Sequence, residues 1–245
     1  MPAKHRIKQY IENGLYHILN RGVAKNLIFT SEQDYHVFQS YLATYLLPKD
    51  TDSLQSILND AHANQTDKSE ALQLLHLNNF SDSIKLFAYS LMPNHFHLYI
   101  RQQDMTAIDQ FMNSLCTRYS MYFNTNHRRV GKLYQDVYKA VPVNNDEHSM
   151  YLTKYIHRNC LSRQREAYYR TNHRDIGSYL FSYPYSSLPE YLGLRKTPWI
   201  HHEEIFSLMY PNSASQIDAM SRYKRYILED DLFHSSIHTN VDEEF

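Results

Sequence analysis

The sequence predicts an α+β fold in which helices cover one face of an antiparallel sheet. Short β-prone segments alternate with segments of helical periodicity up to about residue 161. Their order is strand, helix, strand, strand, helix, strand, helix, with a polar insertion after the first helix. The chain has 245 residues, of which 42% are hydrophobic and 21% charged, so it can bury a sizeable core.

The first unit is a strand followed by a helix. Residues 14–22, GLYHILNRG, form a β-prone run that ends at a glycine. A helix follows, because Thr30 or Ser31 can cap its start. Its apolar positions recur at helical spacing: Tyr35, Phe38, Leu42 and Tyr45. Residues 49–83 are polar and acidic, and we interpret them as an insertion that contains two short helices and no recognisable chemistry.

Two further strands are predicted in residues 83–93 and 95–102. Pro93 and Asn94 separate them, and this pair favours a turn or a bulge. We therefore expect either a hairpin or a kinked sheet edge at this point.

Three elements complete the predicted core. Residues 105–127 have the apolar spacing of an amphipathic helix. Residues 131–143 are β-prone, and 145–161 form a helix with an acidic first turn. The first six elements match a ferredoxin-like (RRM-like) sheet with helices on one face, and the last helix is additional.

The composition changes after residue 175. Residues 176–245 are rich in aromatic residues and proline at first, with a helix expected near 215–229 and an acidic tail at the end. We predict two parts: a domain at 1–175 and an extension at 176–245 that packs on it.

The charge distribution leaves two interpretations open. The net charge is −1 and the pI about 6.9, so the chain as a whole does not indicate nucleic-acid binding. Between residues 118 and 174, however, eleven Lys or Arg stand against four acids, a local excess of +7. This region is either a solvated surface or a basic face for phosphates.

Cysteine content and hydropathy bear on the compartment. The two cysteines, Cys116 and Cys160, imply no disulfide framework and fit a reducing cytoplasm. The first residues lack the apolar core of a signal peptide, and no apolar run approaches membrane-spanning length. We therefore expect a cytoplasmic protein without a membrane partner.

Residues 88–102, AYSLMPNHFHLYIRQ, contain the first candidate site. On a strand, His95 and His97 point to the same face, about 6.5–7 Å apart, and can reach one metal ion. Phe96 and Leu98 would then face the core. The pair is either a coincidence within a strand or half of a metal site.

A third ligand must come from elsewhere, and oxygen suits it best. Two imidazoles with an amide or carboxylate oxygen fit Mn²⁺ or Mg²⁺. A structural zinc site usually includes cysteines, and the sequence has no CxxC. The remaining histidine groups lack companion ligands, and we expect them on the surface: His201, His202, His234 and His238.

The last predicted core helix offers polar groups on one face. Tyr155 and Asn159 are four residues apart and therefore lie on one side of the helix. Leu152, Ile156 and Cys160 form a neighbouring apolar stripe. Tyr155 would lie at the border of the buried face, either as a packing residue or directed toward the sheet.

A family resemblance connects these residues. In chain order the sequence contains YHILNRG, IFTSEQDYHVF, AYSLMPNHFHLYI, RYSMYFNTNHRRVGKLYQDVYKA, YLTKYIHRN and YPYSSLPEYLG. Together, from about residue 14 to 210, these segments resemble the REP-associated tyrosine transposases. Those proteins are relatives of the one-tyrosine transposases of small insertion sequences, within the HUH nuclease superfamily.

The resemblance implies a role for each candidate residue. His95 and His97 match the histidine pair that holds a divalent metal, Mg²⁺ or Mn²⁺. Tyr155 matches the catalytic tyrosine, and Asn159 stands where relatives place a third polar ligand. The implied activity is that of a transposase and endonuclease that nicks and rejoins single-stranded hairpin DNA through a 5′-phosphotyrosine.

We expect the DNA contacts to come from the basic region. The candidates are Arg118, Arg128, Arg129, Lys132, Lys154 and Arg158. The family usually has Asn-Pro where this chain has Asn159-Cys160, which leaves the helix free to continue. A domesticated, non-catalytic hairpin binder is the alternative, and the resemblance is compatible with a monomer or a homodimer.

Overall fold

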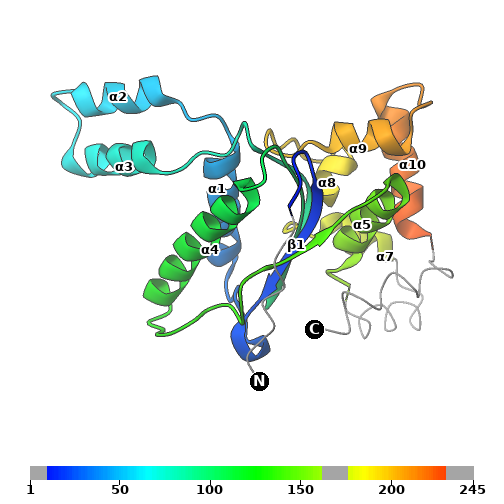
Figure 1. Ribbon diagram of the computed structural model, residues 1–245, viewed down its shortest axis with the longest axis horizontal. Coiled ribbons are helices and arrows are strands. Elements are labelled where there is room, and N and C mark those ends of the chain that lie inside the picture. Colours follow the sequence, from blue (N-terminus) through cyan, green and yellow to red (C-terminus); the bar gives the residue numbers. More distant parts are fainter. Residues whose placement is uncertain (1–9, 162–175, 230–245) are drawn as a thin grey trace.

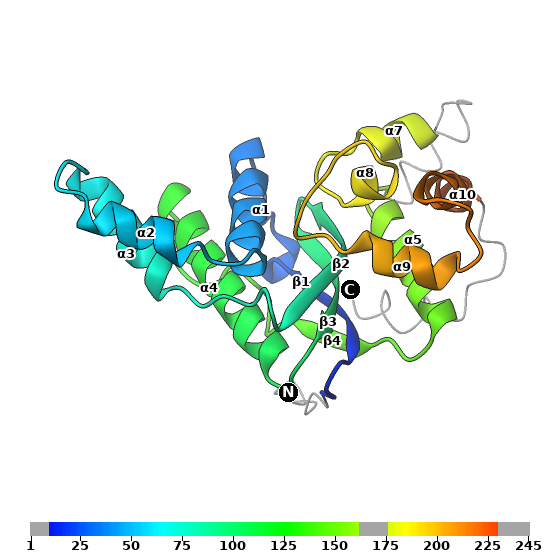
Figure 2. The same cartoon turned by 90° about the horizontal axis from the view of Figure 1, so that it is seen from above.

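The computed structural model describes residues 10–161 and 176–229. A central sheet separates two groups of helices (Figures 1 and 2). On one side of it lie α1 (Glu32–Leu46) and α4 (Ala107–Asn126), and on the other side lies α5 (Asp146–Arg158) with the helices of the C-terminal region. None of the helices in these residues is long and apolar enough to cross a membrane.

The sheet has the predicted topology. β1 (Leu15–Arg21), β2 (Ile84–Met92), β3 (His95–Gln102) and β4 (Lys139–Pro142) are arranged in the order β2-β3-β1-β4. All three pairings are antiparallel. This is the strand order of a ferredoxin-like fold, and the α+β prediction is confirmed.

β4 is much shorter than the strand predicted at 131–143. The segment before it crosses the end of β1, where its backbone bonds to the loop that follows. Leu133 O accepts from Val23 N at 3.0 Å, and Gln135 N donates to Arg21 O at 2.9 Å. These bonds replace a regular ladder, which begins only at Lys139.

The first face of the sheet is covered by α1 (Glu32–Leu46) and α4 (Ala107–Asn126). α1 begins with a capping box, in which Ser31 accepts from Asp34 N and the Asp34 carboxylate accepts from Ser31 N. The apolar residues of both helices, with alternate residues of the strands, form one hydrophobic cluster.

The insertion forms two helices, as predicted. α2 (Thr51–Asn59) and α3 (Gln65–His76) pack mainly against each other and project away from the sheet (Figure 1). α2 has no buried residue, and Ala71 is the buried residue of α3.

The second face of the sheet carries the additional helix α5 (Asp146–Arg158), capped by Asn145. Within residues 176–229, four helices follow: α7 (Ile176–Ser182), α8 (Leu188–Tyr191), α9 (His202–Met209) and α10 (Gln216–Leu228). A second hydrophobic cluster joins residues of β2, α5, α8, α9 and α10. Helices therefore cover both faces, rather than one face alone. The division at residue 175 stays a prediction.

Candidate active site

The turn between β2 and β3 is held in place by the loop after β1. Pro93 O accepts from Ile28 N at 2.8 Å and from Phe29 N at 2.9 Å. Asn94 O accepts from Gly22 N at 2.8 Å. The start of β3, and with it His95, is thereby fixed against the end of β1.

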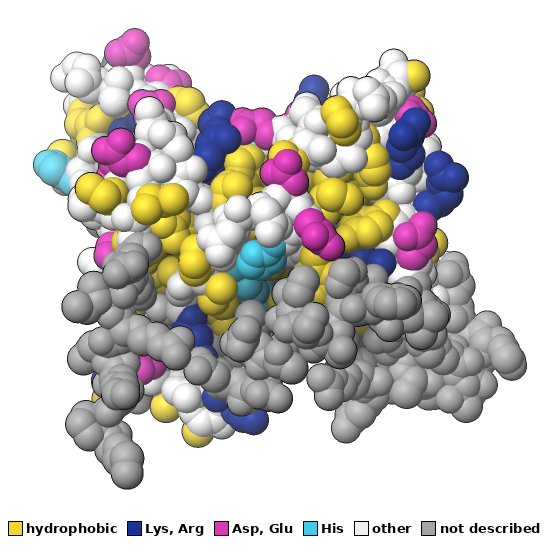
Figure 3. Space-filling view, turned by 45° about the vertical axis from the view of Figure 1, so that its right-hand side comes forward, with side chains coloured by type: hydrophobic (Ala, Val, Ile, Leu, Met, Phe, Trp, Pro, Cys, Tyr) yellow, Lys and Arg dark blue, Asp and Glu magenta, His cyan; other side chains and the backbone are white. Residues whose placement is uncertain are grey.

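A cavity of about 250 Å³ lies at this end of the sheet. β3 contributes His95 and His97, while Phe96 and Leu98 are fully buried on the opposite side. The α5 helix contributes Tyr155, and Asn159 is the C-cap residue that follows it. Figure 3 shows histidine side chains near the centre of the face in view. The structure therefore brings together the four residues that the resemblance assigns to the site.

His95 lies between two amide oxygens. Its Nδ1 is 2.6 Å from Asn94 Oδ1, and its Nε2 is 3.1 Å from Asn159 Oδ1. Because Asn94 Oδ1 can only accept, a neutral ring donates from Nδ1 and directs its Nε2 lone pair toward Asn159. Two acceptor atoms about 3 Å apart match neighbouring ligands of an ion bound at about 2.1 Å. This arrangement fits a divalent metal.

His97 is paired with His17 of β1. The His17 Nε2 and His97 Nδ1 atoms are 2.7 Å apart, and the two rings are stacked at 4.9 Å between centroids. Burial lowers the pKa of His17 to about 3. Burial, followed by the neighbouring His17 and His95, holds the pKa of His97 well below its ordinary value. Both rings are therefore neutral at physiological pH, the form of imidazole that binds metals.

Sequence reasoning missed His17, although a signal for it exists. Tyr16 and Ile18 are buried in the cluster on the first face. Strand alternation therefore places His17 on the second face, as it places His97 there. What the alternation does not give is the pairing of the two strands, which brings these rings together.

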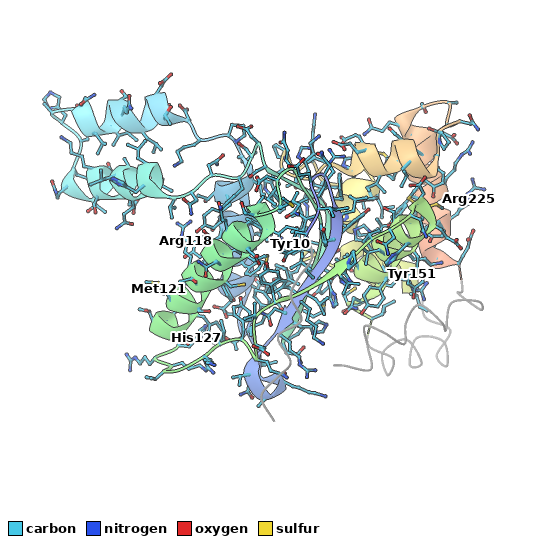
Figure 4. All side chains as sticks on the ribbon, viewed as in Figure 1. Tyr10, Arg118, Met121, His127, Tyr151 and Arg225 are labelled. Atoms are coloured by element: carbon cyan, nitrogen blue, oxygen red, sulfur yellow. The ribbon has the colours of Figure 1, made fainter. Side chains whose placement is uncertain are left out.

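Tyr155 lies beside the histidines. Its ring centroid is 5.5 Å from that of His97, at 90° between the planes, and 5.8 Å from that of His17. Tyr151, one helical turn earlier, is labelled on α5 in Figure 4. The geometry places a phenol at the edge of the histidine pair.

The predicted basic residues are scattered rather than gathered. Arg118 is on α4, across the sheet from α5, and its guanidinium carbon lies 4.0 Å from the Tyr41 ring centroid (Figure 4). Arg129 donates to Asn124 Oδ1 at 3.1 Å and to Lys132 O at 2.6 Å, which braces the loop after α4. Arg128 and Lys132 are exposed on that loop.

Two basic residues of α5 face the C-terminal region. Lys154 is only 1% exposed, and its Nζ lies 4.5 Å from the Tyr226 ring centroid. Arg158 donates from Nη1 to Ile227 O at 2.9 Å. Burial under α10 gives Lys154 no access to a phosphate, so its predicted DNA contact does not fit its placement. The segment 162–174 of the basic region lies outside the described residues.

The expectation of surface histidines is wrong for His202. It is 9% exposed and packs against Tyr191 and Phe206, because the first turn of α9 enters the second hydrophobic cluster. His201 is half-buried. His234 and His238 lie outside the described residues.

A third ligand beside His95 and His97 would have to be of another type. Within residues 10–161 and 176–229, no group of three or more His, Cys, Asp and Glu side chains could hold a metal ion. The amide oxygen of Asn159, 3.1 Å from His95 Nε2, is the candidate that the geometry offers.

The comparison with family models points to the same residues. A model described as "Transposase IS200 like" matches residues 59–159, which include the histidine pair, Tyr155 and Asn159. This segment is therefore similar to the IS200-like transposases. The resemblance seen in the motifs is confirmed, and the family supports a transposase function.

Other comparisons add little to the IS200-like assignment. One solved structure, of a REP-associated tyrosine transposase bound to a REP hairpin, has a TM-score of 0.39 and 10% sequence identity. The alignment covers 79% of this chain and 94% of that one. So distant a likeness carries no inference about this chain. No curated protein matches it.

Proposed function

We propose that this chain is a metal-dependent transposase that nicks and rejoins single-stranded DNA through a covalent link to Tyr155. The observation that carries the proposal is the meeting of four side chains in one cavity. His95 and His97 come from β3, Tyr155 comes from α5, and Asn159 is the C-cap of α5. The family match over residues 59–159 supports the same activity.

His95, His97 and Asn159 would hold the divalent ion, Mg²⁺ or Mn²⁺. The evidence is the convergence of His95 Nε2 and Asn159 Oδ1 at 3.1 Å, next to a second neutral imidazole. When bound, such an ion supplies stabilisation of the charge that develops on the oxygens of the scissile phosphate.

Tyr155 is the proposed nucleophile. Its oxygen attacks phosphorus, a bond forms between them, and the bond from phosphorus to the 3′ oxygen breaks. The tyrosine proton leaves to solvent, and the departing oxygen takes up a proton to become a free 3′-hydroxyl. Because the phosphodiester energy is kept in the 5′-phosphotyrosine, a 3′-hydroxyl can reverse the step and rejoin DNA without ATP. The sequence has no Walker-type glycine loop, which is consistent with this chemistry.

The proposed substrate is single-stranded DNA with a hairpin. One candidate tyrosine in a small cavity suits one strand at a time. Arg128 and Lys132, exposed on the loop after α4, offer positive charge for the backbone.

The test is the covalent adduct. The protein is incubated with Mn²⁺ and labelled single-stranded hairpins from the repeats that flank its gene, then separated on a denaturing gel. We expect a shifted band that is lost in Tyr155→Phe and in His95→Ala. Tyr151→Phe, which removes a hydroxyl one turn away on the same helix, should retain it.

Two other outcomes of this experiment would indicate a different function. Tight hairpin binding without any adduct, unchanged by Tyr155→Phe, would indicate a domesticated binder. Cleavage that survives Tyr155→Phe would indicate hydrolysis by water instead of a tyrosine nucleophile.

A further inference from the structure

Two cations line the same cavity as the proposed catalytic groups. They are Arg21, the last residue of β1, and Lys25, in the turn that follows. Within the described part of the chain, no acidic side chain lines this cavity. We propose that Arg21 and Lys25 form a phosphate-binding subsite, which binds the backbone of single-stranded DNA beside the scissile phosphate. This inference rests on the proposed function and specifies how the same site holds its substrate.

Arg21 is fixed next to the metal-binding strand. It is paired in register with His95, and strand alternation places it on the same face as His17. Its Nε donates to Gln135 Oε1 at 2.6 Å, which orients the guanidinium plane. A guanidinium carries five N–H donors in a rigid fork that suits phosphate oxygens. The oriented guanidinium of Arg21 can therefore donate hydrogen bonds to a phosphate at the cavity.

Lys25 is held in an unusual backbone conformation. Ala24 has φ 53° and Lys25 has φ 61°, the left-handed region that residues other than glycine rarely occupy. Such residues are strained, and the strain persists only where the surroundings hold it. Here Lys25 O accepts from Asn94 Nδ2 at 3.3 Å, so the turn is fastened to the residue before His95. Strain of this kind is typical of functional sites.

The charge of the cavity comes from these two side chains. Arg21 and Lys25 thus supply the attraction for a phosphate. The exposed basic loop lies next to the same turn, because Val23 N donates to Leu133 O at 3.0 Å. Arg128 and Lys132 on that loop can extend the contact along the strand.

The salt dependence of DNA binding tests the subsite. A fluorescently labelled single-stranded hairpin from the flanking repeats is titrated with protein in EDTA at several salt concentrations. Each phosphate contact contributes about 0.7 to the slope of log affinity against log salt for a single strand. We expect Lys25→Met and Arg21→Met each to lower that slope by about 0.7, and Lys25→Arg to restore it. Lys68→Met, on α3 of the projecting hairpin, should leave the slope unchanged.

Two results would overturn the inference. If Lys25→Met and Arg21→Met keep the wild-type slope while wild-type protein binds the hairpin, the subsite is wrong and the proposed function stands. If wild-type protein binds no hairpin at any salt concentration, the proposed function fails and the subsite fails with it. Thermal unfolding of each variant separates a lost contact from a lost fold.

Discussion

The imidazole of His17 contacts that of His97 at 2.7 Å between His17 Nε2 and His97 Nδ1, and each side chain is 2% exposed. A neutral imidazole has one donor and one acceptor nitrogen. If His97 donates from Nδ1 to His17, its Nε2 keeps the lone pair that a metal needs. If His17 donates instead, His97 carries its proton on Nε2 and cannot be a ligand. His17 therefore governs which form of His97 faces the cavity.

From this pairing we expect His17→Phe to weaken metal binding. Phenylalanine keeps a flat ring for the stack and removes the acceptor for His97 Nδ1–H. Loss of such a partner typically lowers metal affinity 10- to 100-fold. Calorimetric titration of each protein with Mn²⁺ measures this affinity.

His36→Phe is the matched control, because His36 is exposed on α1 and does not line the cavity. Equal Mn²⁺ affinity in His17→Phe and wild type would show that His17 does not set the tautomer of His97. Absence of Mn²⁺ binding in wild type would instead argue against the metal site itself.

At the candidate site, local sequence patterns predict which side chains share a face of a strand or helix. The spacing of His95 and His97 on a strand, and of Tyr155 and Asn159 on a helix, follows from fixed periodicities. The alternation in β1 could have been applied to His17 in the same way. Its contact with His97, however, depends on the pairing of β1 with β3, which single-strand patterns do not determine.

The expectations that do not fit the structure fail for a common reason. Sequence reasoning expects His202 on the surface and Lys154 in contact with DNA. The C-terminal helices cover them, since α10 packs on α5 and α9 enters the second hydrophobic cluster. β4 is shorter than predicted because the chain before it bonds to the loop after β1. In each case tertiary contacts override the local preference.

Gly22→Ala should destabilise the turn that carries the site. A Cβ at this position would lie 2.1 Å from the backbone oxygen of Asn26, which cannot move without its peptide. Gly22 N also donates to Asn94 O, so a shift here displaces the start of β3. We expect a loss of about 1–3 kcal/mol in the free energy of unfolding, measured by urea denaturation.

Gly131→Ala serves for comparison with Gly22→Ala. At Gly131 nothing lies within 4 Å of the position that a Cβ would take, and only its φ of +96° is unfavourable. We expect the smaller loss there. A Gly22→Ala protein as stable as wild type would contradict the close approach.

Arg195→Met should be strongly destabilising. Arg195 holds the carboxylate of Glu190, which is 1% exposed, through Nε at 2.6 Å and Nη2 at 2.9 Å. Removing the guanidinium leaves a buried carboxylate without its cation, a change that costs about 3–5 kcal/mol. Urea denaturation measures the loss.

The double variant Arg195→Met/Glu190→Gln isolates the ion pair. It removes the buried charge, and we expect it to recover part of the stability lost in Arg195→Met. If the double variant were no more stable than the single one, the loss would come from packing, and the uncompensated charge would not be its cause.

His202→Phe should stabilise the protein, and more so in acid. Both ring nitrogens of His202 are buried without a hydrogen bond among the described residues, at a cost of about 1–3 kcal/mol that phenylalanine avoids. Nδ1 lies 3.5 Å from Oε2 of the exposed Glu203, a contact too long and too solvated to offset this cost. Burial lowers the pKa of His202 below its ordinary 6.5, so the unfolded chain takes up a proton first as the pH falls. Proton uptake by the unfolded chain therefore lowers the free energy of unfolding of wild type progressively below pH 6.5. The His202→Phe variant does not have this loss.

Thermal unfolding of both proteins between pH 8 and pH 5 tests His202→Phe. The variant should melt at a higher temperature than wild type, and the gap should widen as the pH falls below 6.5. His76→Phe, at the end of α3 in the projecting hairpin, controls for the loss of a titrating ring outside the core. A gap that stays constant with pH, or narrows in acid, would show that His202 is protonated in the folded protein and finds a partner there.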